Sequence, residues 1–90
     1  MDKFVIALER TLRFLQNSQH DGGLGVVSDA KIIVEESLNR YKKERTLGFR
    51  DKGKIRFLFL PTNELQEVSV LNGWGDEYME IAKIVDDFLA

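Results

Sequence analysis

The sequence predicts a mainly α-helical protein, a compact single domain over residues 1–90 built as a bundle of about four helices. The length fits one domain, and 43% hydrophobic residues suffice for a packed core. Near both ends of the chain, apolar residues recur at intervals of three and four, which is the pattern of an amphipathic helix. The absence of cysteine and the single histidine exclude disulfides, cysteine-ligated zinc and multi-histidine metal sites.

Two helices are predicted in the first half of the chain. Asp2 can cap the first, because its carboxylate can accept from the free N–H groups of the first turn. Its apolar stripe is Phe4, Val5, Leu8, Leu12 and Leu15. After a glycine-rich connection over 18–27, Ser28 is expected to begin a second helix that runs to about Lys43. Its apolar stripe is Ala30, Ile33, Val34, Leu38 and Tyr41.

The middle of the chain allows two interpretations. A helix over roughly 51–60, stopped by Pro61, would be followed by a short helix that Asn63 caps and Gly73 ends. The alternative is an α+β fold with a β-hairpin at about 54–71, because the run 55–60 is short and rich in aromatic residues. Periodicity alone does not separate the two for runs this short.

The last segment predicts a helix that reaches the C-terminus. Asp76 is expected to cap it, and Glu77 and Glu80 lie in its first turns, where acidic residues favour the helix dipole. Its apolar stripe is Tyr78, Ile81, Ala82, Val85, Phe88 and Leu89.

Charge is segregated along the chain although the net charge is only −2. Residues 40–56 carry eight bases against two acids, and residues 57–90 carry seven acids against Lys83 alone. Tyr41 and Phe49 lie within the basic stretch and Phe57 directly follows it, and these rings suit stacking with single-stranded nucleic acid. Mutual neutralisation of the two stretches, or two ordinary solvated faces, is the simpler explanation.

A candidate partner-binding site lies in the acidic half. The only tryptophan, Trp74, stands between two glycines and close to Tyr78, and such aromatic residues anchor many protein interfaces. The expected site comprises this pair and four surrounding acids, Glu64, Glu67, Asp76 and Glu77. The alternative is that Trp74 fills the core between two helices.

The segment Leu60-Pro61-Thr62-Asn63-Glu64-Leu65-Gln66-Glu67, with the later Asn72-Gly73-Trp74, resembles a motif of small bacterial proteins that have no established function. The resemblance covers about a third of the chain and implies a bacterial accessory protein. It also favours the helical interpretation of the middle. Asn63 departs from the pattern, because glycine is usual at that position.

These observations predict a non-enzymatic, small acidic protein-interaction domain of the immunity-protein or inhibitor type, which binds a basic partner protein. The alternative is a nucleic-acid-associated accessory protein that uses residues 40–56. No catalytic residue, metal or cofactor is expected, and a homo-oligomer is possible. A cytoplasmic protein is expected, because the sequence shows neither a signal peptide nor a membrane-spanning run.

Overall fold

Five α-helices make up the fold in a computed structural model, which describes residues 2–20, 25–60 and 63–90. They are α1 (Lys3–Asn17), α2 (Val26–Glu44), α3 (Phe49–Leu58), α4 (Glu64–Leu71) and α5 (Gly75–Leu89). The mainly α prediction is confirmed, with five helices instead of about four. The β-hairpin alternative at 54–71 is wrong for the described part of that segment, because residues 54–58 and 64–71 are helical. Residues 61–62, which would form its turn, lie outside the described ranges.

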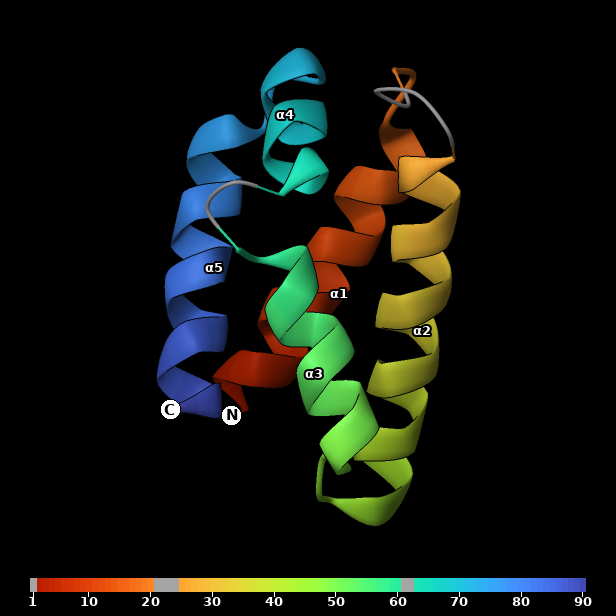
Figure 1. The fold of residues 1–90 in the computed structure, drawn as a ribbon, viewed down its shortest axis with the longest axis vertical. Helices are drawn as coiled ribbons and strands as arrows, with labels where there is room; N and C mark the ends of the chain where they lie inside the picture. The colour runs from red at the N-terminus through yellow and green to blue at the C-terminus, as the bar shows by residue number, and fades with distance from the viewer. Residues whose placement is uncertain (1, 21–24, 61–62) are drawn as a thin grey trace.

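Helix α1 packs between α2 and α5, α3 lies in front of its lower part, and α4 lies above α3 and beside α5 (Figure 1). Both α3 and α4 contact α2 on one side and α5 on the other. Along the long axis of the molecule, α3 occupies the lower part and α4 the upper part (Figure 1). The two short helices therefore present their outer faces at different ends of the bundle.

Every helix contributes buried apolar side chains to one core, whose burial is the main favourable contribution to folding. The most deeply buried include Phe4, Leu8, Leu15, Val34, Ile55, Leu65, Val68, Ile81 and Val85. Where the start of α1 lies against the end of α5, the rings of Phe4 and Phe88 stack with centroids 4.0 Å apart. Tyr41 packs edge-on against both rings.

The helix boundaries confirm some of the predicted caps and correct others. Asp2 caps α1, since its Oδ1 accepts from the amides of Phe4 at 2.9 Å and Val5 at 3.3 Å. The second helix begins at Val26 instead of Ser28, after Gly25 in a left-handed conformation at φ 75°. The last helix begins at Gly75 after Trp74, so Asp76 lies inside the first turn instead of capping it.

Two side chains satisfy backbone carbonyls where α3 ends. Asn63 Nδ2 donates to the Phe57 carbonyl at 2.9 Å, while its Oδ1 accepts from the Leu65 amide at 2.8 Å and caps α4, as predicted. The Tyr78 hydroxyl donates to the Leu58 carbonyl at 3.0 Å in a buried environment. Burial raises the pKa of Tyr78 to about 12, so this donor keeps its proton at neutral pH.

Asn72 joins the end of α4 to the segment that follows α1. Its Oδ1 accepts from the amides of Gln19 at 2.9 Å and His20 at 3.0 Å. Its Nδ2 donates to the His20 carbonyl at 2.7 Å and to the Val68 carbonyl at 2.9 Å. One amide side chain thus holds two segments that are far apart in the sequence.

A bidentate ion pair joins α2 to α3. Arg40 donates to both carboxylate oxygens of Asp51, at 2.8 Å from Nε and 2.6 Å from Nη2. Asp51 is the only acid in α3 and is buried. Hydrogen bonding to Arg40 lowers the pKa of Asp51 below its ordinary value of 3.8, despite burial acting in the opposite direction.

Replacing Tyr78 by Phe (Tyr78→Phe) should lower the free energy of unfolding by roughly 1–3 kcal/mol, because the buried Leu58 carbonyl loses its donor while the ring packing remains. Urea denaturation followed by circular dichroism measures the change. An unchanged midpoint would show that the hydroxyl bond contributes nothing to stability.

Replacing Asp51 by Asn (Asp51→Asn) should destabilise the protein at pH 7 and much less in acid. Because the pKa of Asp51 is lowered in the folded state, its contribution is complete above 3.8 and is lost as the pH falls through the folded value. Urea midpoints of both proteins between about pH 7 and pH 2.5 test this prediction. A difference that stays constant over that range would contradict it.

Candidate functional site

The two aromatic residues of the predicted site lie in the core. Trp74 is 3% exposed and Tyr78 is 1% exposed. Trp74 stacks on Phe14 of α1 with centroids 5.0 Å apart, and its Nε1 donates to Ser18 Oγ at 3.2 Å. The expectation of an exposed aromatic anchor is therefore corrected in favour of the alternative, in which Trp74 fills the core between helices.

Three of the four predicted acids are exposed, and they come from two neighbouring helices. Glu64 and Glu67 lie in the first turn of α4, and Asp76 lies in the first turn of α5. Glu77, also in the first turn of α5, is half-buried. No ion pair involves any of the four among the described residues. The three exposed carboxylates therefore face solvent without a cationic partner from the described part of the chain.

Three apolar side chains accompany these acids, and the sequence prediction missed them. Val70 is 64% exposed, Leu71 54% and Met79 53%. The helices are in direct contact here, because Met79 Sδ lies 3.9 Å from Gln66 Nε2 and a Cβ at Gly75 would meet Val70 Cγ2 at 3.0 Å. The helical spacing of the sequence was enough to predict the exposure of Val70. With Leu65 and Val68 facing inward, a turn of about 100° per residue directs Val70 outward.

We call this region the α4–α5 surface and define it by six residues, Glu64, Glu67, Val70, Leu71, Asp76 and Met79. Around α4, successive turns of about 100° give the order Glu64, Leu71, Glu67, Val70, so acidic and apolar side chains alternate. Met79 follows beyond Gln66, on α5. An apolar surface interrupted by carboxylates suits a partner that carries both apolar and basic side chains.

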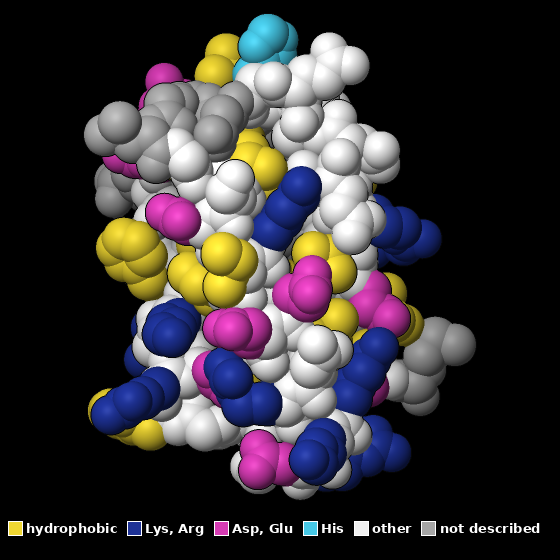
Figure 2. Space-filling model, turned by 90° about the vertical axis from the view of Figure 1, so that its right-hand side faces the viewer, with side chains coloured by type: hydrophobic (Ala, Val, Ile, Leu, Met, Phe, Trp, Pro, Cys, Tyr) yellow, Lys and Arg dark blue, Asp and Glu magenta, His cyan; other side chains and the backbone are white. Residues whose placement is uncertain are grey.

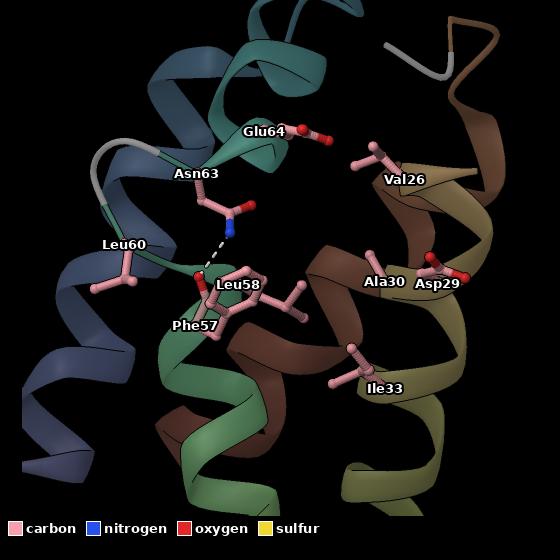
Figure 3. Close-up of a pocket in the computed structure, with 9 residues that line it drawn as sticks. All are labelled: Val26, Asp29, Ala30, Ile33, Phe57, Leu58, Leu60, Asn63 and Glu64. Carbon is pink, nitrogen blue, oxygen red and sulfur yellow. Dashed lines mark hydrogen bonds between the residues drawn. The ribbon is translucent and has the colours of Figure 1, made fainter. Parts of the chain in front are cut away.

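An apolar groove of about 460 Å³ borders this surface on the α2 side, where α2, α3 and α4 meet. Figure 3 shows Ile33 and Leu58 directed into the space between α2 and α3, while Val26 of α2 faces the Glu64 side chain of α4. Glu64 is thus the residue that the groove and the α4–α5 surface share. The groove extends the apolar area that is open to a partner.

The basic stretch over 40–56 is divided by the fold. Arg40 is held by Asp51, and Lys42 Nζ pairs with Glu9 at 3.2 Å. Figure 2 shows Lys and Arg side chains gathered in the lower half of the α2 side, with acids among them. On α3 the pattern differs, because its exposed residues include four bases and two phenylalanines but no acid.

Within the described ranges, no group of three or more histidine and carboxylate side chains is placed to hold a metal ion. The expectation that the chain uses neither metal nor cofactor stays a prediction, as does the expectation that it is not an enzyme. None of the helices over the described residues is both long enough and apolar enough to cross a membrane.

The buried position of Trp74 predicts the fluorescence of the protein, because this residue is its only tryptophan. The tryptophan emission of the native protein should lie at shorter wavelength than that of free tryptophan and should resist quenching by iodide. Unfolding in urea should remove both properties. Quenching of the native protein as rapid as that of free tryptophan would place Trp74 at the surface instead.

The chain matches no protein-family model, and neither the curated proteins nor the solved structures contain a match to it.

Proposed function

We propose that the protein is a non-enzymatic interaction domain that binds a basic partner protein through the α4–α5 surface. The observation that carries the proposal is the exposure of Val70, Leu71 and Met79 beside unpaired carboxylates. Burial of apolar surface is the main favourable contribution to most protein–protein association, and surrounding charges select the partner and speed its approach. The anchor is thus this apolar group and not the buried Trp74.

The small size of the protein and the acidic charge of residues 57–90 support an immunity-protein or inhibitor role in the cytoplasm. Small acidic proteins of this kind cover the basic surface of a toxin or enzyme, including those that act on nucleic acid. Residues 57–90 carry seven acids and one base, which would complement such a surface. Methionine adapts its shape to a partner, and Met79 lies at the junction of the two helices.

The test compares two double variants that have the same net charge and lose comparable apolar area. One combines Glu67→Lys with Met79→Ala on the α4–α5 surface. The matched control combines Glu35→Lys with Ile32→Ala on the exposed face of α2, where Ile32 is 56% exposed. Both should fold, because all four side chains face solvent.

Partners captured from the source organism with the wild-type chain are purified and titrated against each variant by calorimetry. We expect the α4–α5 variant to weaken binding by about tenfold or more, since each anchor residue contributes about 1–2 kcal/mol. The α2 variant should bind like the wild type. Equal binding by all three proteins would show that the α4–α5 surface is not the interface.

A further inference from the structure

We propose that the outer face of α3 binds single-stranded nucleic acid, independently of the α4–α5 surface. The face consists of Phe49, Gly53 and Phe57 with the bases Arg50, Lys52, Lys54 and Arg56. Phe49 is 92% exposed and Phe57 60% exposed, although burial is the usual state of phenylalanine. Neither ring is needed for the core in these positions.

The aromatic residues form a row along the helix. Phe49, Gly53 and Phe57 are spaced by four residues, which places them on one side with the rings about 12 Å apart along the axis. A Cβ added at Gly53 would meet nothing within 4 Å, so neither packing nor a positive φ requires glycine there. The glycine leaves open space between the rings, at a cost of about 1 kcal/mol in helix stability.

Bases border this row on both sides. At about 100° per residue, Arg50 and Lys54 lie beyond Phe57, whereas Lys52 and Arg56 lie beyond Phe49 on the opposite side. All four are exposed. The single acid of α3, Asp51, faces the core and is neutralised by Arg40. The outer face therefore carries four bases with no opposing acid from α3 itself, and Glu36 of α2 is the acid that borders a hollow with Phe49, Arg50 and Lys54.

This combination favours a single-stranded nucleic acid over other anionic partners. Stacking of bases on exposed aromatic rings and contacts of cations with phosphates are the two interactions that such binding requires. A membrane-bound helix needs a broad apolar face, whereas here only two rings and Leu60 at 43% exposure are available. Helix α3 occupies the lower part of the molecule and α4 the upper part (Figure 1), and of the α4–α5 acids Glu64 comes near this face, because it lines the same groove as Phe57.

The experiment titrates a fluorescent oligothymidylate of about 15 nucleotides with the full chain and follows its anisotropy. At about 50 mM salt we expect a Kd of ~10–100 μM, in the range of electrostatic binding without sequence preference. Because phosphates release counterions, the affinity should fall with a log–log salt slope of about −2 to −3 for four bases. Absence of binding at the highest protein concentration would overturn the proposal.

Three substitutions of Phe49 and two double variants separate the contributions of base stacking and of charge. Phe49→Ala should weaken binding by about fivefold or more, and Phe49→Leu should weaken it similarly, because leucine keeps the apolar bulk but cannot stack. Phe49→Trp should retain binding, and oligonucleotide should quench the new tryptophan. The double variant Lys52→Gln with Lys54→Gln should lower the affinity for the oligonucleotide and make its dependence on salt less steep. The control Arg13→Gln with Lys83→Gln removes the same charge from α1 and α5 and should bind like the wild type.

Three outcomes would contradict the proposal. They are full binding by Phe49→Leu, equal or tighter binding of a duplex of the same length, and binding to phosphatidylserine vesicles without binding to the oligonucleotide. None of these measurements depends on the basic partner of the α4–α5 surface. Failure here therefore leaves the proposed protein-binding function intact, and the reverse also holds.

Discussion

The position of α3 against α5 depends on one buried hydrogen bond, from the Tyr78 hydroxyl to the Leu58 carbonyl. Leu58 is the last residue of α3, where carbonyls have no partner within the helix, and burial without a donor would cost free energy. Tyr78 supplies that donor from α5 while its ring stacks on Phe59. The same tyrosine packs edge-on against Trp74, which in turn stacks on Phe14 of α1. A continuous set of packed rings, Phe59, Tyr78, Trp74 and Phe14, thus connects α3, α5 and α1.

This arrangement gives the bundle two outer faces of opposite character. The α4–α5 surface alternates carboxylates with apolar side chains, whereas α3 presents rings bordered by bases. The paired residues Arg40 and Asp51 fix the side of α3 that faces α2, and so leave its other side to solvent. The two helices that carry these faces, α3 and α4, lie at different ends of the long axis (Figure 1).

Periodicity was sufficient to predict α1, most of α2 and α5, because each has a continuous apolar stripe that one core can bury. For α3 and α4 it was insufficient, since short runs satisfy helix and strand patterns equally. Of the residues that the sequence suggested for a site, Glu64, Glu67 and Asp76 are exposed, whereas Trp74 and Tyr78 are buried. Composition cannot reveal that Trp74 finds its partners in Phe14 and Ser18, more than 50 residues earlier, because such contacts exist only after the helices assemble.

The amide of Asn72 has a chemical consequence for the lifetime of the protein. Asn72 precedes Gly73, and an asparagine followed by glycine is the sequence most prone to deamidation, in which the following backbone nitrogen attacks the side-chain carbonyl. In the fold this amide is held by four hydrogen bonds, which restrain it from the attacking geometry. Deamidation would replace the Nδ2 donor by an acidic oxygen facing the carbonyls of His20 and Val68, and would release the segment after α1 from the end of α4. Deamidated protein carries one additional negative charge. The rate at which this form accumulates during storage would therefore measure how often the hydrogen bonds of Asn72 open.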